Sequence, residues 1–227
     1  KKRKKTSKQQ LLIKQNIEDV NHDDSSIVLG TKKVFYDLII LSIGGFSKFY
    51  YKIGSPRSIN KNYQEAAITA IIKHNSKIEN ASQFFLKQGP LAILPFQKNA
   101  FSTVWSVSSD YFNFNKKNLK KILIEKLGKL LNIKQIKKVE YVQSFPINLN
   151  LKTKYFKKNI LILGDGLHIV HPIAGQGFNL VIRDIKKLAE LISKILKHGL
   201  LFKDSLLLRD FYNSRKPENN LFGLGIN

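Results

Sequence analysis

Apolar residues recur at helical and strand spacings along most of the chain, and they predict that helices alternate with strands. Between Lys117 and Leu131 the leucines and isoleucines fall three and four residues apart on one face, which predicts an amphipathic helix. The same spacing predicts a second helix whose apolar positions all face the core, namely Ile185, Leu188, Ala189, Ile192, Ile195 and Leu196. His198-Gly199 is typical of the end of that helix.

Alternating or continuous apolar runs predict strands in the remaining segments. Ser26–Leu29 and Lys33–Phe35 flank Gly30-Thr31 and predict a small hairpin that leads into a strand at Asp37–Leu41. Further β-rich runs cover residues 63–72, 81–96, 102–106 and 141–149. The polar residues 97–99 between two of these runs predict a hairpin turn. No internal repeat is evident.

The most informative stretch follows the apolar run Asn159–Leu163. It reads as strand, acidic turn, glycine-rich loop and helix. A carboxylate at the carboxyl end of a strand, such as Asp165, can accept hydrogen bonds from sugar-like hydroxyls. Gly175 and Gly177 carry no Cβ, so backbone can approach a flat ligand closely. The next helix presents a partial positive charge at its N-terminus. These features suit a polyhydroxylated, ring-bearing cofactor.

Two simpler interpretations compete with a cofactor site. A glycine-rich loop after a strand is common in proteins without any cofactor. Asp165, His168 and His171 are spaced three apart and could suggest a metal site, although no nearby residue supplies a convincing fourth ligand. The complete run GDxxHxxHPxxGQGxNL is far more specific than either fragment.

This run resembles, almost residue for residue, the flavin-binding segment of the FAD-dependent aromatic hydroxylases, and within them the ubiquinone-biosynthesis group of 2-polyprenylphenol hydroxylase type. Residues 81–106 resemble substrate-domain strands of these enzymes, although Trp105 is expected to be a packing residue. Residues 208–220 resemble the family's Y-x-x-x-R-x-x-x-N helix. The resemblance covers about residues 15–225.

The resemblance implies an α/β (α+β) fold in which a partial, Rossmann-like FAD-binding lobe is discontinuous and receives an inserted β-sheet substrate lobe. We expect a remnant of the FAD lobe at 1–54, the substrate lobe at 55–148 and the rest of the FAD lobe at 149–227. Asp165 would bind the ribityl chain. The implied cofactor-binding residues are Gly44, Gly164, Asp165, Pro172, Ala174, Gly175, Gln176, Gly177, Phe178 and Asn179.

The implied activity is hydroxylation of a polyprenylated phenol during ubiquinone synthesis, with FAD as cofactor and NAD(P)H as electron donor. In this family the cofactor carries the redox chemistry, so no side chain is assigned a catalytic role. The implied partners are the phenol substrate, the membrane that holds it, and a quinone-biosynthesis complex.

The chain departs from the family in two places. It contains no G-x-G-x-x-G motif, so we expect about the first quarter of the family's length and its closing helical segment to be absent. Within the family's D-G-x-x-S-x-x-R motif, Gly44 and Ser47 are kept, but a buried Ile43 is expected in place of the aspartate and Tyr50 replaces the arginine. Tight FAD binding by this chain alone is therefore not expected. The alternative is a non-catalytic remnant, or a partner subunit that needs a separate N-terminal nucleotide-binding half.

Composition narrows the remaining choices. The 43% hydrophobic content argues for a folded protein, and the lack of cysteine excludes disulfides and thiolate metal sites. The net charge of +23 alone would suggest nucleic acid or an anionic membrane surface. Only 5 of the 39 cationic residues are arginine, and lysines are spread along the chain, which disfavours nucleic acid. Without a signal-peptide pattern or a long apolar run, we expect a cytoplasmic protein that associates peripherally with the inner face of the membrane.

Overall fold

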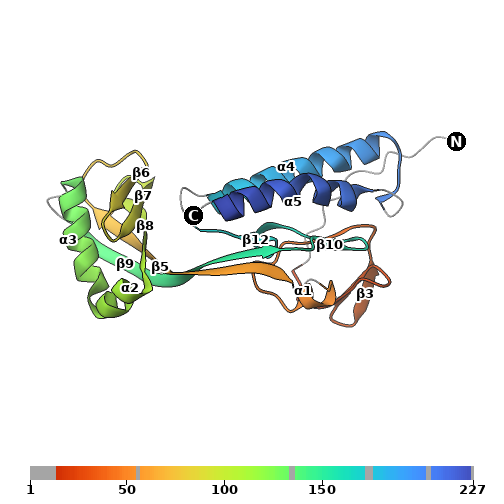
Figure 1. The fold of residues 1–227 in the computed structure, drawn as a ribbon, viewed down its shortest axis with the longest axis horizontal. Coiled ribbons are helices and arrows are strands. Elements are labelled where there is room, and N and C mark those ends of the chain that lie inside the picture. Colours follow the sequence, from red (N-terminus) through yellow and green to blue (C-terminus); the bar gives the residue numbers. More distant parts are fainter. Residues whose placement is uncertain (1–13, 55–56, 133–135, 172–175, 203–205, 226–227) are drawn as a thin grey trace.

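Two long antiparallel strands connect the two ends of an elongated molecule (Figure 1). The computed structural model describes residues 14–54, 57–132, 136–171, 176–202 and 206–225. Strands β5 (Ser58–His74) and β9 (Ile136–Lys152) each run for 17 residues. They form the middle of a six-stranded sheet with the order β12-β9-β5-β8-β7-β6.

One end of the molecule is a sheet packed against helices. Its elements are β6 (Ser82–Leu86), β7 (Gly89–Gln97), β8 (Ala100–Ser108), α2 (Ser109–Asn115), the 3-10 turn η1 (Lys116–Asn118) and α3 (Leu119–Leu131). The predicted helix is confirmed as α3, which buries Leu119, Leu123 and Leu127 and ends where Asn132 adopts φ 49°. Trp105 is completely buried in this core, as predicted, and the hairpin turn between β7 and β8 is confirmed.

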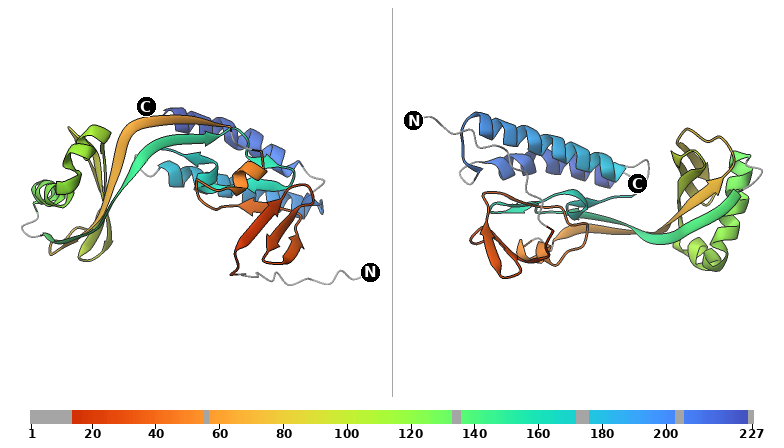
Figure 2. Two further views of the ribbon diagram at one scale, coloured as in Figure 1. Left: turned by 90° about the horizontal axis from the view of Figure 1, so that it is seen from below. Right: turned by 180° about the vertical axis from the view of Figure 1, so that it is seen from behind.

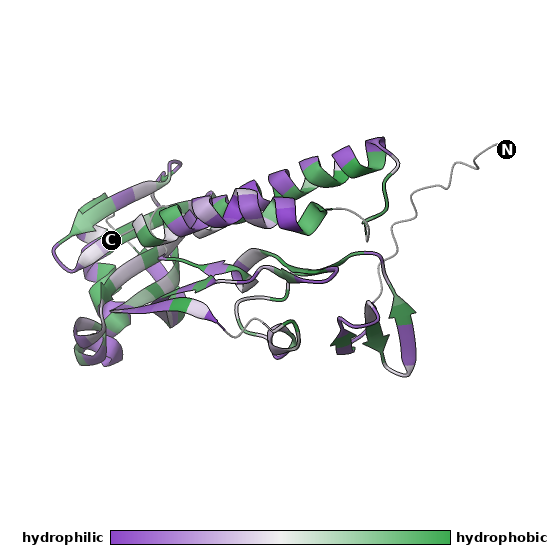
Figure 3. Ribbon diagram, turned by 45° about the vertical axis from the view of Figure 1, so that its right-hand side comes forward, coloured by the Kyte–Doolittle hydropathy of each residue, from purple (hydrophilic) through white to green (hydrophobic). Residues whose placement is uncertain are grey.

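The other end combines a short sheet with two long helices. Its elements are β4 (Ile39–Leu41), α1 (Phe49–Lys52), β10 (Phe156–Lys157), β11 (Ile160–Ile162), the 3-10 turn η2 (Gly164–Gly166), β12 (His168–Ile169), α4 (Gln176–Lys197) and α5 (Leu207–Gly225). The order of the short sheet is β10-β11-β4, and β11 runs parallel to β4. Helices α4 and α5 lie side by side over it (Figures 1 and 2). Their surfaces carry both hydrophilic and hydrophobic residues (Figure 3).

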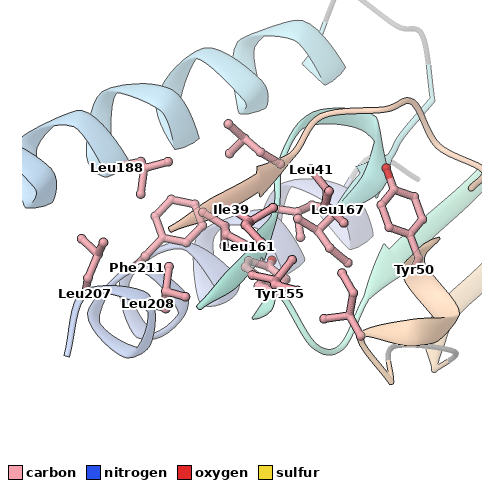
Figure 4. Close-up of a cluster of buried hydrophobic side chains, with 14 of the residues drawn as sticks. Ile39, Leu41, Tyr50, Tyr155, Leu161, Leu167, Leu188, Leu207, Leu208 and Phe211 are labelled. Carbon is pink, nitrogen blue, oxygen red and sulfur yellow. The ribbon is translucent and has the colours of Figure 1, made fainter. Parts of the chain in front are cut away.

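A second core fills the space between this sheet and the helices (Figure 4). Leu161 of β11 and Phe211 of α5 are fully buried in it, and Tyr50 closes one end. The predicted small hairpin is confirmed beside this core as part of a separate sheet, in which β1 (Ile17–Asn21), β2 (Ser26–Leu29) and β3 (Lys32–Phe35) follow one another. Gly30 at the hairpin turn has φ 58°, which favours glycine.

The structure confirms a mixed α/β fold class but corrects the expected buried face of α4. Leu188 and Ile195 are buried, whereas Ala189 is exposed and Ile185 and Leu196 are 45% and 59% exposed. The buried row is narrower than the apolar pattern because the sheet and α5 cover only one side of the helix. The helix end at Gly199 is as predicted, with φ 68°.

The domain boundary expected at residue 148 falls inside β9, so the division into lobes stays a prediction. Among the described residues, no helix has the length and apolar character needed to cross a bilayer.

Candidate functional site

The parallel strands β4 and β11 bring two distant loops to one edge of the short sheet. Because parallel strands end at the same edge, the segment after Leu41 and the segment after Ile162 lie together. The Leu163 N–H donates to the Leu41 carbonyl at 2.9 Å. A Cβ on Gly164 would lie 3.4 Å from the Ser42 Oγ, so the two loops are in contact. The fold thus assembles the predicted residues Gly44 and Asp165 at one edge.

Asp165 lies in the turn η2 at this edge, with an exposed side chain. Gly164 before it adopts φ 76°, and the Leu167 N–H donates to the Gly164 carbonyl at 2.8 Å, which closes the turn. The turn therefore presents a carboxylate outward from the end of a buried strand. Such a group can accept hydrogen bonds from ligand hydroxyls.

Tyr50 anchors the neighbouring loop at Gly44 by a hydrogen bond. Its side chain is buried, and its hydroxyl donates to the Gly44 carbonyl at 2.5 Å. Burial raises the Tyr50 pKa, and the negative charge of Asp165 acts in the same direction. The phenol therefore stays neutral and keeps its proton for this bond. Gly166 has no room for a Cβ, because the Tyr50 hydroxyl and the Ile162 side chain occupy that space.

Ile43 differs from the expectation of a buried side chain. It is 38% exposed, because β4 ends at Leu41 and residue 43 lies on the loop beyond the core. As a hydrocarbon it still offers no acceptor at this position.

The N-terminus of α4 lies against the segment after β12, where a Cβ on Gly177 would be 3.5 Å from the Val170 Cγ2. Gln176 and Gly177 are half-buried, and Phe178 and Asn179 are exposed. No acidic residue lies in the first turn, so the partial positive charge of this helix end is not neutralised locally. The predicted residues Pro172, Ala174 and Gly175 lie outside the described residues.

A buried polar network, which the sequence analysis missed, supports the segment that follows Asp165. The His168 Nε2 lies 2.7 Å from the Asp184 Oδ2, and the Arg215 Nε donates to the Asp184 Oδ1 at 2.6 Å. Asn219 donates to the Asp184 Oδ1 at 3.2 Å and to the Tyr155 hydroxyl at 3.3 Å. The network ties β12, α4 and α5 together, so it holds the turn at Asp165 against both helices.

One signal in the sequence could have revealed this network. Leu180, Asp184 and Leu188 follow one another at four-residue spacing, and all three are buried. A carboxylate within an apolar row must find partners on neighbouring elements, because an unpaired buried charge is costly. Arg215 and Asn219 are also four apart on α5 and supply them.

A second histidine links this segment to the long strands. The His171 Nε2 lies 2.8 Å from the Glu65 Oε2, and Tyr63 packs edge-on against the imidazole ring. Glu65 follows a bulge in β5, where Gln64 adopts φ 54°. His168 and His171 therefore face different carboxylates. Within the described residues, no group of three or more His, Asp or Glu side chains could hold a metal ion.

The described part of the site fits a polyhydroxylated cofactor. It combines the exposed Asp165 carboxylate with the backbone of Gly44, at φ 80°, and an uncompensated helix N-terminus. A Cβ on Gly44 would meet no atom within 4 Å, so the surface beside it is open. These groups can bind hydroxyls and an electron-rich ring edge.

Comparisons with known proteins identify the family of the chain. Residues 51–210 match the family described as "FAD binding domain". The chain is 24% identical over 248 residues to the ubiquinone biosynthesis monooxygenase COQ6 of Dictyostelium discoideum, a match that covers 86% of this chain and 48% of that protein. It is 30% identical over 164 residues to the ubiquinone hydroxylase UbiL of Rhodospirillum rubrum, covering 70% and 38%. The chain thus spans less than half the length of these curated relatives.

Solved structures share the fold at low sequence identity. PqsL, a probable FAD-dependent monooxygenase from Pseudomonas aeruginosa, superimposes with a TM-score of 0.71 at 19% identity, covering 92% of this chain and 61% of that chain. The flavin-dependent halogenase CmlS gives a TM-score of 0.70 at 16% identity, covering 91% and 40%. These structural matches therefore also confirm the expected fold class.

Proposed function

The chain belongs to the family of FAD binding domains, and on that premise we propose that it forms part of a FAD-dependent monooxygenase of ubiquinone biosynthesis. The proposed reaction is hydroxylation of the aromatic ring of a polyprenylphenol. The observation that carries the proposal is the exposed Asp165 at the joint edge of β4 and β11, next to the loop that holds Gly44. The names of the relatives COQ6 and UbiL support the choice of pathway.

Asp165 would accept hydrogen bonds from the ribityl chain of FAD. Backbone groups would hold the ring system, and we assign this role to Gly44, Gly164, Pro172, Ala174, Gly175, Gln176, Gly177, Phe178 and Asn179. FAD, once bound, supplies the redox chemistry by taking electrons from NAD(P)H and activating dioxygen. The residues of the chain bind and orient the cofactor and exclude water from it.

The substrate would approach from the β-sheet lobe. Residues 55–148 are proposed as the substrate lobe, with 1–54 and 149–227 as the FAD lobe. Polyprenylated phenols reside in membranes, and the net charge of +23 supports loose attachment to an anionic membrane surface. Such attachment would bring the substrate to the protein without a spanning helix.

A second candidate function is that of a subunit that needs a separate nucleotide-binding half. Strand β4 is at the edge of its sheet, and Ile40 on it is exposed. Helix α4 carries the exposed apolar side chains of Phe178, Ile182 and Ile185 at four- and three-residue spacing. An added strand and helix from a G-x-G-x-x-G polypeptide would cover both surfaces.

Reconstitution distinguishes the two functions. The chain is loaded with FAD and supplied with NADPH, dioxygen and a short-chain polyprenylphenol, and the product is analysed by mass spectrometry. A product heavier by one oxygen atom supports a monooxygenase formed by this chain. A product that forms only after addition of a G-x-G-x-x-G polypeptide supports the second function. If no product forms under either condition, both candidate functions are contradicted.

A further inference from the structure

Helices α2 and α3 form the outer surface of one end of the molecule, at the opposite end from α4 and α5 (Figures 1 and 2). Their inner faces are fixed on the sheet, because Tyr111 and Phe112 of α2 pack against its core and α3 buries its leucine row there. The Ser108 Oγ accepts a hydrogen bond from the Tyr111 N–H at 3.2 Å and caps α2. The fold therefore decides which side chains of the two helices point outward.

The outward face carries a strong positive charge. From α2 to α3 the chain contains six lysines and two acidic residues, Asp110 and Glu125. Lys126 is held by a hydrogen bond to the Gln88 Oε1 at 3.0 Å and lies over the Trp105 ring. The other five are exposed, and none of them forms an ion pair within the described residues, namely Lys116, Lys117, Lys120, Lys121 and Lys129. These five residues are the lysine patch, and an anionic surface would complement its charge.

Phe114 lies next to the lysine patch, two residues before Lys116. Its side chain is 90% exposed, the largest exposed fraction of any large hydrophobic side chain in the described residues. The Asn115 side-chain amide donates to the Tyr111 carbonyl at 2.9 Å and holds the end of α2 on which Phe114 lies. Transfer of a phenyl ring from water to an apolar phase is favourable, so this ring is suited to insertion.

The surface of a bilayer with anionic lipids fits both features. Lysines close to such a surface are attracted to the headgroups, and an aromatic ring beside them can lie between headgroups and acyl chains. Helix α3 cannot insert as an amphipathic helix does, because its leucine row is already buried in the protein core. The helix would instead rest on the surface by its lysines. Nucleic acid is favoured less, since sites for it commonly use arginine, which α2 and α3 lack.

We propose that the lysine patch docks the chain on an anionic membrane surface and that Phe114 inserts its ring among the lipid headgroups. The attachment that the net charge of the whole chain supports is thereby assigned to one surface. The contact brings the end of the molecule formed by β6, β7, β8, α2 and α3 to the bilayer. That it serves to collect a polyprenylated phenol rests on the proposed function, whereas the contact itself does not.

The test of the lysine patch is flotation of the intact chain with vesicles of phosphatidylcholine alone and with vesicles that also contain phosphatidylglycerol. Only the anionic vesicles should bind, and added salt should weaken the binding. The double variant Lys120→Gln, Lys121→Gln should bind at least about tenfold more weakly. The control Lys194→Gln, Lys197→Gln removes the same charge from exposed positions on α4 and should bind like the unmodified chain.

The ring is tested with Phe114→Ser, whose vesicle affinity should fall about tenfold. Its melting temperature should not change, because the ring is exposed in the folded chain. Phe85→Ser on β6 is the control, since Phe85 is 81% exposed. Phe84 beside it packs against the core under α3, and side chains alternate along a strand, so Phe85 faces away from the helices. The vesicle affinity of Phe85→Ser should be that of the unmodified chain.

Equal losses in the two double lysine variants, unchanged affinity in Phe114→Ser, or equal binding to both kinds of vesicle would overturn the inference. A polyglutamate peptide or a DNA duplex that binds through Lys120 and Lys121 while vesicles do not bind would also overturn it. Flotation uses neither flavin nor phenol, so its result does not depend on the proposed reaction. Anionic vesicle binding through the lysine patch by a chain that hydroxylates no phenol would contradict the proposed function alone.

Discussion

His168 and Asp184 form a buried hydrogen-bonded pair, with 2.7 Å between Nε2 and Oδ2 and side chains that are 1% and 0% exposed. The pair joins β12, which directly follows the turn at Asp165, to the middle of α4. Arg215 on α5 approaches the other oxygen of the same carboxylate. The candidate cofactor residue Asp165 is therefore positioned by a network in which Asp184 is the common acceptor.

Replacing Asp184 should strongly destabilise the protein. Asp184→Leu leaves the buried Arg215 without the Asp184 carboxylate, so we expect the free energy of unfolding to fall by roughly 3–5 kcal/mol. Urea unfolding followed by circular dichroism measures the loss. Glu190→Gln on the same helix removes one side of an exposed ion pair with Lys187 and should cost no more than about 1 kcal/mol. Equal losses in the two variants would contradict the network.

Gly166 is predicted to tolerate no side chain. Gly166→Ala would place a Cβ against the Tyr50 hydroxyl and the Ile162 side chain, and should cost about 1–3 kcal/mol of unfolding free energy. Gly225→Ala is the control, because a Cβ there would meet no atom within 4 Å. Thermal melts of both variants give the comparison. A Gly166→Ala protein as stable as the control would mean that the Tyr50 hydroxyl does not pack against Gly166.

Tyr155 gives the stability a pH dependence in alkaline solution. Burial raises its pKa from 10.0 to about 12. Since the folded-state pKa is the higher one, the contribution of Tyr155 to stability is present below pH 10 and is lost as the pH rises towards 12. Melting temperatures measured from pH 9 to pH 12 should therefore fall, and the fall should be shallower in Tyr155→Phe. Identical slopes in both proteins would refute the assignment.

The bond between His171 and Glu65 should matter for the cofactor more than for the fold. Glu65→Ala removes the partner of an imidazole that directly precedes the predicted flavin loop, so FAD affinity should weaken by about tenfold. Quenching of flavin fluorescence measures that affinity. Glu79→Ala removes an exposed carboxylate paired with Lys77 and should leave the affinity unchanged. An unchanged FAD affinity in Glu65→Ala would show that the pair of His171 and Glu65 does not contribute to cofactor binding.

The sequence predicts elements set by local patterns and fails where distant segments meet. Helix α3 and its end follow from leucine spacing, and the turn at Gly30 follows from glycine between two β-rich runs. The apolar spacing predicts that Ile185 is buried, and this prediction is wrong. Its exposure depends on where α5 and the sheet lie, which the spacing within its own helix does not encode. The partners of Asp184 lie 16 to 35 positions away, so only the folded chain brings them together.

The same limit applies to the site. The motif around Asp165 identifies one loop by its residues, but its contact with the loop at Gly44 depends on the parallel pairing of β4 and β11. Glu65 carries no motif either, and its bond to His171 depends on how the folded chain places β5 beside that segment.

The central claim, that the Asp165 turn binds flavin, is tested most directly by titrating the purified chain into FAD and recording the visible absorbance. A saturable shift of the flavin bands is predicted for the unmodified chain and for Asp110→Ala, whose exposed carboxylate lies on α2 at the other end of the molecule (Figure 1). In Asp165→Ala the shift should require at least about tenfold more protein. A flavin spectrum that the unmodified chain leaves unchanged, or that Asp165→Ala shifts equally well, would contradict the claim.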